Sequence, residues 1–298
     1  MTKKVFSKVM LRMAILVILA LCGLATVPQQ GGFVAMASNT CDTLLSSGSG
    51  ATLMIICISN EGNLVRFDSP AGFEQIGQLN LFRDGYAICS GNLPTFANTP
   101  EGYDPGDVSR EALFGPATVS QPGGPNTLPL TITRTSTSGT YALTQSFARD
   151  VLRRTVTITM TIKRLNNADC TSSGCPPVRL QRAFEGDVDN NTSANARFGR
   201  SQDSVWEWID TTGHGLQLTN VANGGATPIT TVYTVADYDP SGAGAQAAKG
   251  CIVFAGQVAT PTDPSVTDAA NLVGRLMYFF GNIPLNASKT VKVVYERF

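Results

Sequence analysis

An acidic loop is the first feature of this sequence that could do chemistry. Asp187, Asp189 and Asn191 stand at alternate positions and offer three oxygen atoms, the ligand type that Ca²⁺ prefers. The spacing is not that of an EF-hand, because Thr192 stands at position six and Phe198 at position twelve. Two interpretations stay open: a Ca²⁺ site of another kind, or a solvated turn whose side chains bond their own backbone. Ca²⁺ is the only cofactor that the sequence suggests.

A pair of tryptophans follows the acidic loop. Trp206 and Trp208, the two tryptophans of the chain, are two residues apart and should share one face of a strand. With Glu185 and Arg200 nearby in sequence, they could stack on the apolar face of a sugar while polar groups meet its hydroxyls. The alternative is that both tryptophans fill a core between sheets. We therefore predict a carbohydrate site at Trp206, Trp208, Glu185 and Arg200, with the core role as its competitor.

Catalysis has weaker support. Glycoside hydrolases use two carboxylates about 5–10 Å apart, and Glu185, Asp187 and Glu207 are the candidates for such a pair. The single histidine, His214, lies between two glycines and is expected in a turn. No Gly-x-Ser-x-Gly elbow is present. We assign no catalytic residue, and a glycoside hydrolase or lyase is kept as an alternative function.

The N-terminus resembles a secretory signal peptide. Residues 1–12 contain four basic residues and no acid, Met13–Leu24 is apolar, and small residues precede Ser38. The apolar run is shorter than the about 20 residues that span a bilayer. We predict that residues 1–37 are a leader, that the protein is secreted or otherwise extracytoplasmic, and that no stable membrane insertion follows cleavage. A retained anchor is the alternative.

Charge argues against nucleic-acid binding. The chain has 22 basic and 22 acidic residues, and loss of the four basic residues of the leader gives the mature chain a net charge of −4. The sequence has no basic run of the kind that follows a phosphate backbone. Nucleic acid is therefore not an expected partner, whereas an extracellular carbohydrate is.

Six cysteines remain after the leader, an even number that suggests disulfides in an exported chain. Cys170 and Cys175 flank a Thr-Ser-Ser-Gly turn that brings its own ends together, so we predict a bridge between them. The pairing of the other four stays open: Cys41, Cys57, Cys89 and Cys251.

The elements that would position these residues are strands. In the segment 154–163, Val156, Ile158, Met160 and Ile162 alternate with threonines and Lys163, which predicts a long strand with one buried face. Many similar segments separated by Gly, Ser and Asn turns predict an all-β antiparallel sandwich. Only 266–273 looks helical. Residues 38–298 are expected to form a single β-sandwich domain with a long loop near 93–125.

The pattern also resembles a known family. The run TYALTQSF…RTVTITMTIK, followed by VRLQRAFEGDVDN and the closing IPLNASKTVKVVY, is similar to galactose-mutarotase-like supersandwich domains over about residues 125–298. The resemblance implies two stacked antiparallel sheets and a concave face that many relatives use to hold carbohydrate. That family's chemistry resembles a paired-histidine arrangement, which one histidine cannot supply. The expected function is a secreted, non-catalytic, carbohydrate-binding protein, with the enzyme and a structural surface or matrix component as alternatives.

Overall fold

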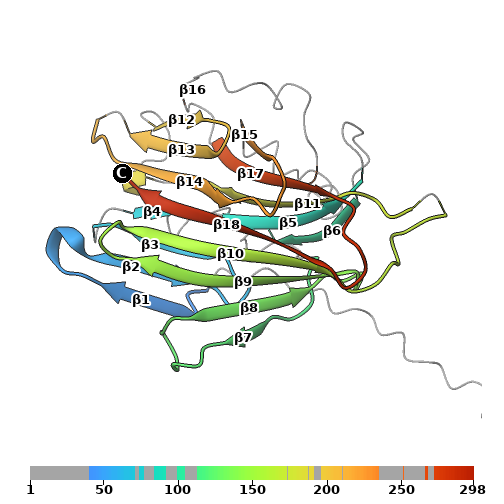
Figure 1. The fold of residues 1–298 in the computed structure, drawn as a ribbon. Helices are drawn as coiled ribbons and strands as arrows, with labels where there is room; N and C mark the ends of the chain where they lie inside the picture. The colour runs from blue at the N-terminus through green and yellow to red at the C-terminus, as the bar shows by residue number, and fades with distance from the viewer. Residues whose placement is uncertain are drawn as a thin grey trace, which may run out of the picture. The chain divides into compact units, whose positions relative to one another are not determined.

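The structure is a computed structural model (Figure 1). It describes residues 40–70, 74–76, 84–91, 99–104, 113–172, 174–186, 188–190, 196–209, 211–234, 251, 266–267 and 272–298. These residues belong to one compact unit, Val34–Phe298. The predicted leader, residues 1–37, lies outside the described residues. Within the described part of the chain, no helix is long and apolar enough to cross a membrane.

Almost every element is a strand, which confirms the all-β class. The strands are β1 Thr43–Ser47, β2 Met54–Ile58, β3 Leu64–Asp68, β4 Glu74–Ile76, β5 Asp84–Ser90, β6 Thr99–Asp104, β7 Thr118–Ser120, β8 Leu130–Thr135, β9 Tyr141–Asp150, β10 Thr155–Arg164, β11 Val178–Phe184, β12 Ala196–Arg200, β13 Ser204–Ile209, β14 Gly215–Ala222, β15 Pro228–Thr234, β16 Val266–Thr267, β17 Leu272–Gly281 and β18 Ser288–Arg297. Two single-turn 3₁₀ helices, η1 (Gly50–Thr52) and η2 (Val188–Asn190), complete the described elements.

The strands form three antiparallel sheets. The largest has nine strands in the order β16-β12-β13-β14-β18-β10-β9-β8-β7. A five-stranded sheet has the order β15-β17-β11-β5-β6, and a four-stranded sheet the order β1-β2-β3-β4. Figure 1 shows β18, β10 and β9 in front of β5 and β11. One hydrophobic core takes side chains from all three sheets, so the nine-stranded sheet packs against the two smaller ones.

The alternation in 154–163 predicts β10 correctly. Val156, Ile158, Met160 and Ile162 are buried in the core, and the threonines between them point to the opposite face. β10 pairs with β9 on one side and β18 on the other, which leaves it central in the sheet. Cross-strand hydroxyl pairs such as Thr161 with Thr290, 2.9 Å apart, lie on the outer face.

Two local predictions are wrong. The segment 266–273 is not a helix where it is described: Val266 and Thr267 pair with β12 as β16, and Leu272 begins β17. Residues 268–271 lie outside the described residues. The edge of β12 gives the backbone of Val266 and Thr267 hydrogen-bond partners, whereas an isolated helix of two turns is marginally stable in water. The segment 93–125, expected as a loop, contains β6, which pairs with β5, and β7, which pairs with β8.

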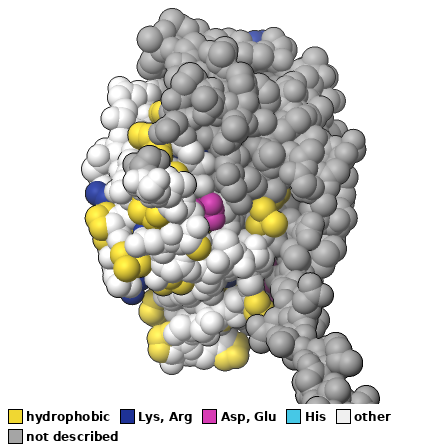
Figure 2. All heavy atoms as spheres, turned by 90° about the vertical axis from the view of Figure 1, so that its right-hand side faces the viewer, with side chains coloured by type: hydrophobic (Ala, Val, Ile, Leu, Met, Phe, Trp, Pro, Cys, Tyr) yellow, Lys and Arg dark blue, Asp and Glu magenta, His cyan; other side chains and the backbone are white. Residues whose placement is uncertain are grey.

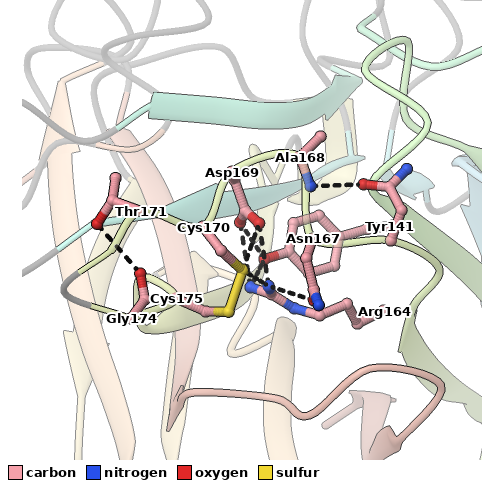
Figure 3. Close-up of a disulfide and its surroundings, with 10 residues drawn as sticks. Tyr141, Arg164, Asn167, Ala168, Asp169, Cys170, Thr171, Gly174 and Cys175 are labelled. Carbon is pink, nitrogen blue, oxygen red and sulfur yellow. Dashed lines mark hydrogen bonds and ion pairs between the residues drawn. A yellow bond between two sulfur atoms is a disulfide. The ribbon is translucent and has the colours of Figure 1, made fainter.

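Three disulfides connect the described cysteines. Cys41 bonds Cys57, Cys89 bonds Cys251, and Cys170 bonds Cys175, with Cα–Cα distances of 5.4, 5.5 and 4.0 Å. Figure 3 shows the last of them beside Arg164, whose guanidinium donates to both carboxylate oxygens of Asp169, at 3.0 and 3.1 Å, and to the Tyr141 hydroxyl at 2.6 Å. The bridge therefore closes a short turn that a buried ion pair also holds.

Candidate functional site

The two tryptophans lie on the outer face of the nine-stranded sheet. In β13 the buried residues Val205, Glu207 and Ile209 alternate with Trp206 and Trp208, which are both partly exposed. Antiparallel pairing places Gly199 of β12 opposite Trp206. The tryptophans thus point away from the main core, not into it.

Glycines let aromatic rings lie flat on this face. The Trp206 indole occupies the space that a Cβ at Gly199 would need. On the next strand, the Phe298 ring covers Gly215 in the same way, and Gly215 is the partner of Trp208. Phe298 is itself 46% exposed. Three aromatic side chains therefore form one surface, called here the aromatic face: Trp206, Trp208 and Phe298.

The other residues predicted for this site lie elsewhere. Arg200 pairs in register with the core-facing Val205, so it is on the side of β12 opposite the tryptophans, where it donates to the Thr230 carbonyl at 3.1 Å. Glu185 is buried just after β11, in the five-stranded sheet. The polar neighbours that the register brings to the tryptophans are Arg197, opposite Trp208, and Gln217, opposite Trp206.

The glutamates proposed for catalysis are both buried. Glu207 is 1% exposed, and its carboxylate fills the space beside the Gly186 backbone. Glu185, the neighbour of that glycine, is also buried. Asp187 lies outside the described residues. Glu185 and Glu207 are therefore among packed side chains and not on the aromatic face.

The acidic loop is described only in part, because Asp187 and Asn191 lie outside the described residues. Both carboxylate oxygens of Asp189 are 2.8 Å from Nδ1 of His214, and one accepts a hydrogen bond from Thr212 at 2.6 Å. Over the described residues, no group of three or more His, Cys, Asp or Glu side chains could hold a metal ion. His214 thus joins the turn after β13 to η2.

Sequence reasoning missed a buried polar network that joins the sheets. Arg182 of β11 forms an ion pair with Asp84 of β5 and donates to Gln145 of β9. Tyr295 of β18 donates to Asp84 at 2.6 Å. Burial and the charge of Asp84 raise the pKa of Tyr295, so its hydroxyl keeps the proton that it donates. Arg182 on the apolar face of a strand was the signal for this network.

A second buried pair lies one strand away. Arg134 of β8 pairs with Asp104 of β6 and donates to the Tyr86 hydroxyl at 3.0 Å. Asn63 also donates to Asp104, at 2.8 Å. Burial lowers the pKa of Arg134, but the neighbouring Tyr86 and Asp104 outweigh it and raise that pKa. These pairs hold the sheets in register, and each ion has a partner.

Comparisons with known proteins give a fold and no family. No protein-family model matches the chain, and no curated protein matches its sequence. A solved bacterial glucoamylase in complex with acarbose is similar in structure, with a TM-score of 0.54 and 12% identity over 88% of this chain. The chain spans only 32% of that glucoamylase.

Two further structures match less closely. A heparinase III matches with a TM-score of 0.44 and 6% identity over 88% of this chain and 36% of its own. A candidate aldose 1-epimerase from Escherichia coli K12 matches with a TM-score of 0.46 and 9% identity over 86% of this chain and 99% of its own. At these identities the likeness concerns the fold alone, and of these three structures only the glucoamylase matches with a TM-score above 0.5.

Proposed function

We propose that this protein binds carbohydrate on the aromatic face and does no chemistry there. The observation that carries the proposal is the partial exposure of Trp206 and Trp208 on the outer face of the nine-stranded sheet, beside Phe298. Sugar rings present a flat C–H face that stacks on such side chains, while hydroxyls meet polar groups at the edge. Arg197 and Gln217 are the polar groups nearest by register.

Exposure of the tryptophans favours binding over a purely structural role, because core-filling tryptophans would be covered. The similar fold of a glucoamylase solved with acarbose supports a carbohydrate as the ligand class. Glu207 lies on the opposite face of β13 from the tryptophans, which argues against hydrolysis at this surface. The proposed ligand site is therefore Trp206 and Trp208, with Phe298, Arg197 and Gln217 around them.

The two tryptophans are the only ones in the chain, so tryptophan fluorescence reports on this face alone. A glycan array should identify ligands, and titration of the full chain with a selected oligosaccharide should change the tryptophan emission saturably. Trp206→Ala should weaken array binding at least about tenfold, a loss of roughly 1.4 kcal/mol. The matched control is Phe280→Ala, which removes a partly buried ring from β17 and should leave binding unchanged.

A second variant tests the ring position and keeps both tryptophans. Gly199→Ala should displace the Trp206 indole and weaken binding, whereas Gly115→Ala meets its nearest atom at an ordinary 3.5 Å and should not. Binding that survives both Trp206→Ala and Gly199→Ala would place the ligand elsewhere. If the protein binds no glycan on the array, the proposal of carbohydrate binding is wrong.

Export and calcium are tested separately. We infer that the chain is exported, because three disulfides accompany the predicted leader. Mass spectrometry of the secreted protein should find Ser38 at its N-terminus. Ca²⁺ at Asp187, Asp189 and Asn191 stays a prediction: chelation should lower Tm if the loop binds Ca²⁺, and an unchanged Tm would favour the solvated turn.

A further inference from the structure

The outer face of the five-stranded sheet, which is a different sheet from the one with the aromatic face, carries a second group of polar side chains. On β11, Arg179, Gln181 and Ala183 alternate with Leu180 and Arg182, which face the core. Opposite Arg179 on β5 is Cys89, whose disulfide to Cys251 belongs to a small apolar cluster on this face. The side chain of Arg179 therefore points away from the main core.

Arg179 is buried and has no partner among the described residues. It is 1% exposed, and none of its three guanidinium nitrogens has a hydrogen-bond acceptor in that part of the chain. No ion pair among the described residues includes it. A guanidinium has five N–H donors and stays charged, so such burial costs several kcal/mol unless something compensates it. Native proteins rarely leave a buried donor unmatched, and each exception needs an explanation.

A second arginine lies close by. Arg275 of β17 is also 1% exposed and donates to Gln181 at 3.2 Å and to the Thr231 hydroxyl at 3.0 Å. The bond to Gln181 brings its guanidinium to within two strand positions of Arg179, about 7 Å along β11. Burial and then the charge of Arg275 lower the pKa of Arg179 to about 10. Two positive charges therefore share this face.

The acid that follows β11 does not reach Arg179. Glu185 comes two residues after Ala183, which is the partner of Arg275, so it lies at the Arg275 end, six residues or roughly 20 Å from Arg179. Figure 2 shows few charged side chains among the described residues on the side that it presents. Among the described residues, Arg179 has the like charge of Arg275 and the amide of Gln181 nearby, and no carboxylate forms an ion pair with it.

We propose that Arg179, with Arg275 and Gln181 beside it, forms a binding site for an oxyanion: a sulfate, phosphate or carboxylate group. The planar guanidinium fork matches two oxygens of such a group, and the negative charge would compensate Arg179. A neutral ligand would leave that charge uncompensated. The site lies on a different sheet from the aromatic face and does not rest on the carbohydrate proposal.

The test is anion binding by the full chain. Calorimetric titration at constant ionic strength with sodium sulfate, inorganic phosphate and sodium glucuronate, each up to about 10 mM, should show saturable binding of at least one. Sulfate or phosphate alone would indicate a tetrahedral anion, and glucuronate alone a carboxylate. No saturable binding of any of the three would overturn the proposal without the need for a variant.

Variants connect the binding to Arg179. Arg179→Met should weaken the binding of the anion at least about tenfold. Arg179→Lys keeps the positive charge without the planar guanidinium fork and should weaken the binding less. The control Arg153→Met removes a side chain that is 79% exposed and should bind as the wild type does. Sulfate also stabilises proteins because it is excluded from their surface. A rise in Tm with sulfate therefore supports binding only by the amount that it exceeds the rise measured for Arg179→Met. Equal binding by wild type, Arg179→Met and Arg179→Lys would assign the anion to another site.

Discussion

Arg182 and Arg179 are three residues apart on β11 and equally buried, but their surroundings differ completely. Arg182 faces the core, where Asp84, Gln145 and the Gly62 carbonyl accept its hydrogen bonds. Arg179 faces the other side of the sheet and has no acceptor in the described part of the chain. A strand sends neighbouring side chains to opposite faces, so position alone separates the two roles.

The difference shows what burial of a charge can mean. A buried ion whose partners are all present contributes to register and folding, because removing one partner leaves the other uncompensated. A buried ion without partners destabilises the protein until a ligand arrives. We therefore expect the two arginines to respond in opposite directions when their environment is changed.

The largest effect is expected at Asp84. Asp84→Asn removes the charge that compensates Arg182 and should lower the free energy of unfolding by about 3–5 kcal/mol, measured by urea denaturation. The control Asp150→Asn affects an exposed pair with Arg153 and should cost less than about 1 kcal/mol. Equal losses in the two variants would show that the Arg182 pair does not stabilise the fold.

Arg275 is an intermediate case, since Thr231 and Gln181 both accept its hydrogen bonds. Thr231→Val keeps the shape of a fully buried side chain and removes one acceptor from a charged donor. The free energy of unfolding should fall by about 1.5–3 kcal/mol in the same denaturation experiment. An unchanged free energy of unfolding would mean that the Thr231 hydroxyl does not stabilise Arg275.

Arg179 should behave in the opposite way. In buffer without oxyanions, Arg179→Met removes an uncompensated buried charge and should raise the free energy of unfolding by about 1–2 kcal/mol. Arg182→Met, the matched change on the core face, should lower it. The comparison fails if Arg179→Met destabilises the protein as much as Arg182→Met does.

The smallest effect is expected at Glu61, beside the Arg134 pair. Burial and then the charge of Asp104 raise the pKa of the Glu61 carboxyl above 4.5. The folded state therefore binds this proton more tightly, and the contribution of Glu61 to stability is lost as pH rises from about 4.5 through the raised pKa. Glu61→Gln should raise the free energy of unfolding by less than about 1 kcal/mol at pH 7 and leave it unchanged at pH 4, as measured by urea denaturation at both pH values. A pH-independent difference would exclude this cause.

The predictions made from the sequence succeeded where a pattern is local. Strict alternation from Val156 to Ile162 needs only the geometry of one strand, and it identified β10 and its buried face. Alternation also separated Trp206 and Trp208 from Glu207. It failed for 266–273, because a capping pattern carries no information about the edge of β12 that pairs with Val266 and Thr267.

The partners of the polar residues depend on segments that are distant in the chain. Arg182 and Asp84 are 98 residues apart, Tyr295 and Asp84 are 211 apart, and Cys89 and Cys251 are 162 apart. Arg200 and Glu185, close to the tryptophans in sequence, lie on other faces, while Phe298 comes to Trp208 through pairing with Gly215. Sequence proximity is a poor guide here because sheet register sets which side chains meet.

The sequence by itself determined the β class, the buried face of the central strand and the turn that joins Cys170 to Cys175, since each depends on neighbouring residues and their backbone geometry. Only the tertiary structure decided which charges are compensated. Alternation predicts that Arg179 and Arg182 lie on opposite faces of β11, but the packing of separate sheets gave Asp84 to Arg182 and, among the described residues, no partner to Arg179. Compensation is a property of three-dimensional contact, because electrostatic interaction depends on distance in space and on the exclusion of water.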